Sequence, residues 1–188
     1  GWADVPLQQL HGDAAQRALA AAGVRVRLGS RVADLDALAA DRPDHVVLAA
    51  PPAEAERLAG DAVLAPAGWA DALGSSPIVN LHLVVDRPVL EHRFVAAVDG
   101  PLQWVFDRTA ASGLARGQCL AASLSAADDL VHLTVAQLRG LLWPHLVRLL
   151  PGLARAEVLD LFVTRERRAT FRPAPGSARY RPGTRTRR

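Results

Sequence analysis

Residues 76–85 read Ser-Pro-Ile-Val-Asn-Leu-His-Leu-Val-Val, and this stretch decides the fold of the middle of the chain. Its residues alternate between two faces, which predicts a strand with one buried face; that face carries Val79, Leu81, Leu83 and Val85. The opposite face carries Ile78, Asn80, His82 and Val84. Further short strands are expected at 94–98, 102–106 and 118–124. Their hairpin-like spacing predicts an antiparallel sheet.

The region before this sheet has a different pattern. Apolar residues at helical spacing predict a helix over 7–22, and a shorter helix is expected over 53–59, after Pro51-Pro52. Three stretches are typical of strands: 24–28, 31–35 and 45–50. The last is a continuous apolar run, as in a strand buried on both faces of a parallel sheet. The region therefore predicts an α/β segment.

After the sheet the chain returns to helix. Ser125-Ala126-Ala127-Asp128 has the pattern of a capping box, which predicts a helix from about residue 126 to 150, with a kink at Pro144. Residues 158–165 predict a last strand, with Leu159, Leu161 and Val163 on one face. Beyond Phe171 no periodicity is left.

The composition excludes several classes of protein. Half of the 188 residues are hydrophobic and 22% are charged, which is typical of a globular chain. No apolar stretch is long enough to span a membrane, and residues 1–4 show no signal peptide. The single cysteine, Cys119, and six histidines without ligand spacing predict no metal site. Glycine-rich phosphate loops and the G-x-S-x-G elbow are absent, and no catalytic residue can be assigned.

Charge is distributed unevenly along the chain. All 22 basic residues are arginine, and residues 165–188 hold nine of them against one acid, a local net charge of +8. The other residues carry 13 arginines and 18 acids. A basic tail of this kind is compatible with nucleic acid, an anionic cofactor or a solvated end.

Two aromatic residues stand close together in the predicted sheet. Trp104 and Phe106 are two positions apart, so both point to one face of their strand. They belong either to an ordinary core or to the wall of an apolar pocket.

The order of these segments resembles a known family. Residues 24–32 followed by Asp-His-Val-Val-Leu-Ala-Ala-Pro-Pro at 44–52 are similar to the flavin-containing amine oxidase and phytoene desaturase superfamily. Within it, Gln-Trp-Val-Phe-Asp-Arg at 103–108 and Arg-Glu-Arg-Arg-Ala-Thr-Phe at 165–171 resemble the squalene-associated FAD-dependent desaturases, or hydroxysqualene dehydroxylases. The same branch is similar at 76–83, 86–90, 123–128 and 181–186.

The resemblance implies an α/β (α+β) fold, with a partial FAD-binding Rossmann-like sheet and a substrate domain built on a mainly antiparallel sheet and helices. It implies part of the FAD-binding domain at 1–75, a substrate-binding domain at 76–165, and a basic connector at 166–188 that returns toward the FAD domain, left unpaired. Family members also have an N-terminal G-x-G-x-x-G unit and a C-terminal AGD-type segment, so an incomplete, inactive fragment is expected.

The resemblance also implies a function: FAD-dependent reductive dehydroxylation of hydroxysqualene to squalene, in squalene and hopanoid biosynthesis. Alternatives are a desaturase-like or amine-oxidase-like flavoenzyme with another substrate, and a non-catalytic, basic-tailed binding module. The expected partner is an apolar isoprenoid and not nucleic acid, in a cytoplasmic protein with peripheral access to the membrane. The resemblance places Val32, Ala50 and Pro51 at FAD; we expect a substrate pocket formed by Trp104, Phe106, Phe171, Asp107 and Arg168.

Overall fold

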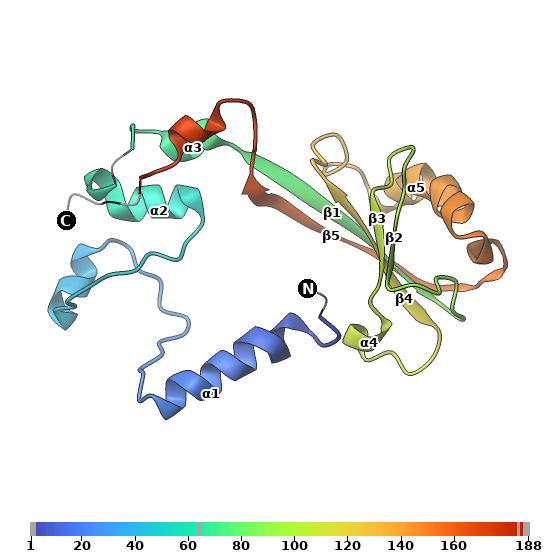
Figure 1. Cartoon of the computed structure of the whole chain (residues 1–188), viewed down its shortest axis with the longest axis horizontal. Coiled ribbons are helices and arrows are strands. Elements are labelled where there is room, and N and C mark those ends of the chain that lie inside the picture. Colours follow the sequence, from blue (N-terminus) through green and yellow to red (C-terminus); the bar gives the residue numbers. More distant parts are fainter. Residues whose placement is uncertain (1–2, 64, 184, 186–188) are drawn as a thin grey trace. The chain divides into compact units, whose positions relative to one another are not determined.

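A computed structural model describes residues 3–63, 65–183 and 185. The chain forms two compact units (Figure 1). Unit 1 comprises Gly1–Arg25 and Ser76–Ala169, and unit 2 comprises Val26–Ser75 and Thr170–Arg188. This division groups residues 1–25 with the sheet, and the domain bounds predicted from the sequence, 1–75, 76–165 and 166–188, stay predictions. The FAD-binding and substrate-binding roles of the domains stay predictions.

Unit 1 is built on a five-stranded sheet in the order β2-β3-β4-β1-β5. The strands are β1 (Ser75–Val85), β2 (Phe94–Ala96), β3 (Trp104–Asp107), β4 (Gln118–Ser125) and β5 (Val158–Phe171). Antiparallel ladders join β2 to β3, β3 to β4 and β4 to β1. Ala122 pairs with Val105 on one side and Leu81 on the other. The predicted antiparallel sheet is therefore confirmed.

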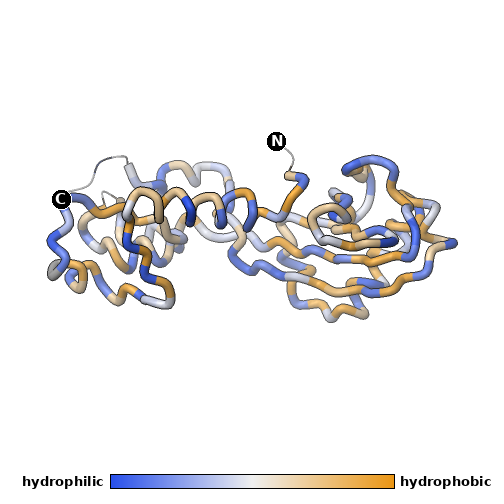
Figure 2. Tube along the Cα trace, turned by 90° about the horizontal axis from the view of Figure 1, so that it is seen from below, coloured by the Kyte–Doolittle hydropathy of each residue, from blue (hydrophilic) through white to orange (hydrophobic). Residues whose placement is uncertain are grey.

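The core of unit 1 lies between one face of this sheet and helix α5 (Val135–Leu149). The predicted apolar face of β1 is fully buried, and hydrophobic stretches run along the strands of this unit (Figure 2). Leu138, Leu142 and Leu146 recur every four residues on α5 and are also fully buried. Residues spaced by four lie on one face of a helix, so α5 covers the sheet with a continuous leucine stripe.

The predicted start of this helix is wrong by about nine residues. Ser125–Asp128 does not begin a helix, because Ala126 has φ 52°, in the left-handed region. The capping box is at Thr134 instead: its Oγ1 accepts from Gln137 N at 3.2 Å, and Gln137 Oε1 accepts from Thr134 N at 2.9 Å. From there α5 continues through Pro144 as one element.

The strands predicted before the sheet are not formed in the described part of the chain. Residues 24–28, 31–35 and 45–49 are extended or bent without pairing, and Val47 is 88% exposed. A strand needs a neighbour for its backbone N–H and C=O groups, and no described segment pairs with these. The residues that the structure describes therefore form only the antiparallel sheet of the predicted α/β (α+β) fold, and not the partial Rossmann-like sheet. The predicted helices are confirmed, as η1 (Gln8–Asp13) with α1 (Ala14–Ala21), and α2 (Pro52–Ala59).

Strand β5 differs from its prediction in length and phase. It continues to Phe171, so residues 166–171 of the predicted connector are in strand conformation. Leu159 is 56% exposed, whereas Leu161 and Val163 pack against the core as predicted. Asp160 Oδ1 accepts from Leu161 N at 2.7 Å. This bond occupies the backbone N–H of Leu161, next to the position at which the alternation of buried and exposed residues along β5 shifts.

Unit 2 has a small core of its own around α3 (Trp69–Leu73). Phe171 and Tyr180 pack against it, the latter from η5 (Ser177–Tyr180); the other short helices of the unit are η2 (Asp36–Asp41) and η3 (Gly60–Ala62). The Arg181 guanidinium lies 4.3 Å from the centre of the Phe171 ring. Tyr180 and Arg181 of the basic tail therefore make contacts within unit 2, and the role of the tail as a connector stays a prediction.

Candidate functional site

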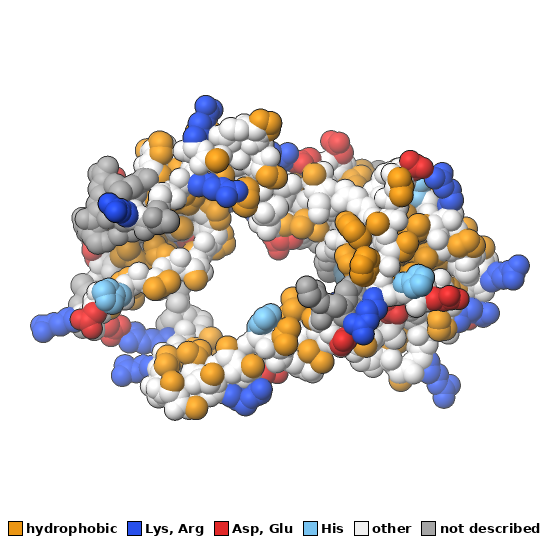
Figure 3. All heavy atoms as spheres, viewed as in Figure 1, with side chains coloured by type: hydrophobic (Ala, Val, Ile, Leu, Met, Phe, Trp, Pro, Cys, Tyr) orange, Lys and Arg blue, Asp and Glu red, His pale blue; other side chains and the backbone are white. Residues whose placement is uncertain are grey.

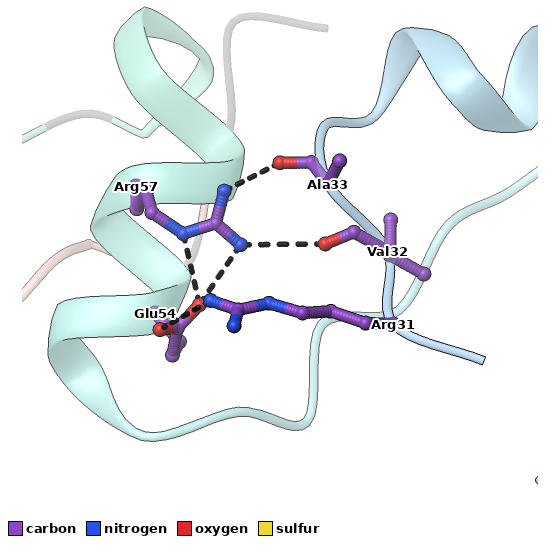
Figure 4. Close-up of polar contacts among 5 residues, drawn as sticks. All are labelled: Arg31, Val32, Ala33, Glu54 and Arg57. Atoms are coloured by element: carbon purple, nitrogen blue, oxygen red, sulfur yellow. Dashed lines mark hydrogen bonds and ion pairs between the residues drawn. The ribbon is translucent and has the colours of Figure 1, made fainter. Parts of the chain in front are cut away.

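One arginine connects the residues of unit 2 that the sequence places near a cofactor. The Arg57 guanidinium on α2 donates to the carbonyl oxygens of Ala33 and Val32, the latter at 3.3 Å (Figure 4). Its Nε also donates to Glu54 Oε2 at 2.9 Å. Arg31 is only an outer member of this group, since its Nη2 lies 3.8 Å from Glu54 Oε1. Glu54 orients Arg57, and Arg57 holds the 32–33 backbone on α2.

The three predicted FAD residues therefore belong to one local assembly. Val32 is on the segment that Arg57 holds, and Pro51 is the N-cap of the helix that carries Arg57. Val32 and Ala50 are half-buried and Pro51 is exposed. Their contact with FAD stays a prediction.

The surroundings of Val32, Ala50 and Pro51 are less suited to the phosphate groups of a flavin nucleotide than to an uncharged end of it. The first turn of α2 carries Glu54, which opposes a phosphate at that helix end. Backbone groups beside Val32 suit a neutral heterocycle, which needs hydrogen bonds and no charge. The family resemblance assigns Val32 to the adenine end of FAD, and Ala50 and Pro51 to the strand end that passes close to the cofactor; these assignments stay predictions.

A second candidate site is the sheet face of unit 1 that points away from α5. Phe94, Trp104 and Phe106 gather on strands β2 and β3, with ring centres 5.8 to 6.2 Å apart. Phe94 is 48% and Trp104 44% exposed. Figure 3 shows hydrophobic side chains at the surface over this part of unit 1. Trp104 and Phe106 are thus wall residues of an open face, and not core.

The face continues across the next strands of the sheet. Strand β4 contributes a small side chain, and strands β1 and β5 contribute aromatic rings. In the ladders, Phe106 pairs with Ala121 of β4, and Ala121 pairs with His82 of β1. The His82 ring stacks on Phe162 of β5, with centres 4.5 Å apart and planes at 8°. We call the surface made by these side chains the open face; it comprises Phe94, Trp104, Phe106, Ala121, His82 and Phe162. Along this face the aromatic rings of β2 and β3 are separated by Ala121 from the stacked rings of His82 and Phe162.

His82 brings a polar group into this apolar surface. Its Nε2 lies 3.1 Å from Thr164 Oγ1, which also accepts from Asn80 Nδ2 at 3.4 Å. Burial, and secondarily the positive charge of Arg108, lower the pKa of His82 below its ordinary value. The imidazole is therefore neutral at pH 7.

The other predicted pocket residues lie elsewhere. Asp107 is used within the fold, since it accepts from Thr109 N and from Gln118 Nε2, both at 2.8 Å. Arg168 is exposed on β5, and Phe171 belongs to the core of unit 2. The structure thus brings Trp104 and Phe106 together on the open face, and the roles of the other three stay predictions.

Sequence reasoning missed Arg57, and it placed His82 on the less apolar face of its strand without assigning it a partner. Arg57 is 25 residues from Val32, and His82 is 82 residues from Thr164. No local pattern signals either pair. Over the described ranges, no cluster of His, Cys, Asp or Glu could hold a metal, and no helix is long and apolar enough to cross a membrane.

Comparison with known proteins identifies the class. Residues 9–188 match the family described as flavin containing amine oxidoreductase, whose members are FAD-dependent oxidoreductases. The chain belongs to the flavin-containing amine oxidoreductase family, and its cofactor is FAD. A search of curated proteins found no significant match. The superfamily resemblance is confirmed by this match, whereas the squalene branch is not identified by it.

Proposed function

We propose that this flavoenzyme acts on a polyisoprenoid, through reductive dehydroxylation of hydroxysqualene to squalene. The observation that supports this substrate class is the open face, with Phe94 and Trp104 nearly half exposed beside Phe106. An elongated hydrocarbon buries its own apolar surface by lying on such aromatic rings. In the reaction a C–O bond is replaced by C–H, and the hydroxyl leaves as water. FAD, when bound and reduced, supplies the two electrons.

The roles of this chain's residues are to bind and to orient. The rings of the open face hold the chain of the substrate and exclude water from it. Arg57 keeps the 32–33 backbone in place for the cofactor. An apolar substrate dissolves in membranes, so we expect a cytoplasmic protein that collects it by peripheral contact with the inner face.

A turnover assay tests the proposal. Because residues 1–188 alone are expected to be inactive, the assay uses the full-length flavoprotein. Loaded with FAD and reduced with dithionite, it is given hydroxysqualene, and squalene is measured by gas chromatography with mass spectrometry. Trp104→Ala is expected to lower kcat/KM about tenfold or more, since a large buried apolar contact is worth about 1.5–3 kcal/mol. Leu141→Ala removes an exposed leucine from α5 and is expected to have no effect. Absence of squalene, with hydrogen peroxide formed from amines in air, would contradict the proposal.

The remaining alternatives predict different outcomes in the same assay. A desaturase-like member would oxidise a polyene and leave hydroxysqualene unchanged. A non-catalytic, basic-tailed module is disfavoured by the family match and by the packing of Phe171 and Tyr180 in unit 2. Salt-dependent retention on DNA would support that module.

A further inference from the structure

Helix α5 carries a second row of apolar and small residues, apart from the leucine stripe that covers the sheet. Ala136, Gly140, Trp143 and Val147 follow one another at spacings of four, three and four residues, so they lie along one side of the helix. We call these four residues the outer stripe. Ala136 and Gly140 are exposed, whereas Trp143 and Val147 pack on the core with only part of their surface. A helix that is apolar on a second side is typical of one that contacts a second apolar environment.

The charges around the outer stripe have one sign. From residue 130 to 156 the sequence contains three arginines and no Asp or Glu. The exposed Arg139 guanidinium lies 5.7 Å from the centre of the Trp143 ring and makes no ion pair within the described chain. Arg148, further along α5, pairs with Asp99 of the β2–β3 loop at 3.5 Å. The charge beside Trp143 is therefore positive and uncompensated, which favours an anionic partner.

The helix is suited to lie in a membrane interface and not to cross a bilayer. It has 15 residues, whereas a spanning helix needs about 20. Pro144 has no N–H, so the Gly140 carbonyl, one turn before it, lacks its helical donor and depends on water. Water is present among lipid headgroups and absent from the hydrocarbon. An indole with an arginine beside it is typical of the headgroup level, where the ring buries its apolar part and the guanidinium stays with the phosphates.

We propose that the outer stripe of α5 docks on an anionic lipid bilayer, with Trp143 at the headgroup level and Arg139 beside the lipid phosphates. A second copy of this chain is a poorer partner, because pairing of two outer stripes would bring one Arg139 close to the other. The inference rests on the proposed function for the expectation of a membrane contact, and it adds the surface that makes this contact.

Sedimentation with vesicles tests the proposal on the full chain. The vesicles contain phosphatidylcholine alone, or equal parts of phosphatidylcholine and phosphatidylglycerol. Binding is expected to the anionic vesicles, and to weaken as salt screens the charges. Arg139→Gln is expected to lower the partition coefficient about fivefold. Arg116→Gln makes the same charge change at an exposed position before β4 and is expected to leave binding unchanged.

A gain of binding separates docking from loss of folding. A Cβ at Gly140 would meet open space among the described residues, and leucine favours helix more than glycine does, so Gly140→Leu keeps α5 intact. A leucine buried over about half of its surface is expected to raise the partition coefficient about fivefold. Ala115→Leu, in the exposed loop before β4, adds similar apolar surface and is expected to have no effect. Thermal unfolding verifies that each variant is folded.

Tryptophan fluorescence locates the contact. Anionic vesicles are expected to shift the emission to shorter wavelength, and the shift is expected to disappear in Trp143→Phe. If the shift persists in Trp143→Phe and disappears in Trp104→Phe, the contact lies on the open face and the proposal is wrong.

Other outcomes overturn the proposal in different ways. If Arg185→Gln in the basic tail lowers binding as much as Arg139→Gln does, the contact is not specific to α5. Equal binding to both kinds of vesicle excludes an anionic partner, and a dimer that Gly140→Leu strengthens identifies a second copy as the occupant. In each case turnover of hydroxysqualene supplied in detergent by the full-length flavoprotein is unaffected, so failure of the docking surface is distinguishable from failure of the proposed function.

Discussion

Replacement of Arg57 by alanine is expected to weaken FAD binding although Arg57 itself need not touch the cofactor. The guanidinium holds the carbonyl groups of Val32 and Ala33 against α2 (Figure 4). Without it the 32–33 backbone is free in the unbound protein and must be ordered when FAD binds. The loss of affinity therefore measures how much Arg57 pre-organises this segment.

The size of the effect follows from the bonds and their exposure. Hydrogen bonds to a charged group contribute about 1.5–3 kcal/mol when buried. The Arg57 side chain is 40% exposed, so screening by water reduces the two bonds together to about 1–2 kcal/mol. This corresponds to an increase in the Kd of FAD of about 5- to 30-fold.

Flavin fluorescence titration measures this change, and limited trypsin digestion of the protein without FAD reports the loosened segment. Arg31→Ala is the matched control, because Arg31 is 81% exposed and makes only a 3.8 Å ion pair with Glu54. Its effect is expected to be about 0.5 kcal/mol or less. An unchanged FAD affinity in Arg57→Ala, or an equal loss in Arg31→Ala, would refute the reasoning.

Other expected outcomes concern stability and titration. Leu142→Ala is expected to lower the free energy of unfolding by about 2–5 kcal/mol in urea, because it leaves a cavity under α5, whereas exposed Leu141→Ala changes it little. Thr134→Ala is expected to cost about 1 kcal/mol by removing the cap of α5, and Ser125→Ala about 0.5 kcal/mol or less. NMR titration of His82 is expected to give a pKa below about 6.5. The unfolded chain then binds a proton that the folded protein does not, so the free energy of unfolding decreases as pH falls below about 6.5, and less so in His82→Phe; equal pH dependence in both proteins would count against this.

The sheet could be predicted because its signal is local. Alternation in residues 76–85 assigns each side chain to a face, and burial of Val79, Leu81, Leu83 and Val85 follows that assignment. The helix after the sheet was misplaced for the opposite reason. Ser125–Asp128 matches the capping pattern, but Ala127 N donates to Pro77 O, and this contact with β1 turns the chain away from helix.

An apolar pattern was not sufficient for residues 24–28 and 45–50 to form strands. These stretches have the composition of strands, yet the described chain places no partner beside them. A strand forms its interstrand hydrogen bonds only with a neighbouring segment. The apolar pattern of a stretch therefore indicates that it can form a strand, but does not determine whether a partner lies beside it. In the candidate sites, Trp104 and Phe106 could be found from their spacing, while the partners of Arg57 and His82 could not.

The sequence by itself determined the family, through the order of its motifs along the chain, and the alternating faces of the central strands, since alternation depends on residue order within a few positions. Only the tertiary structure decided that Arg57 holds the backbone at Val32, that His82 stacks on Phe162 with Nε2 beside Thr164, and that Tyr180 of the basic tail packs on α3. Such contacts join residues far apart in sequence. Their formation depends on how the whole chain closes its loops and buries its apolar surface, which local periodicity does not encode.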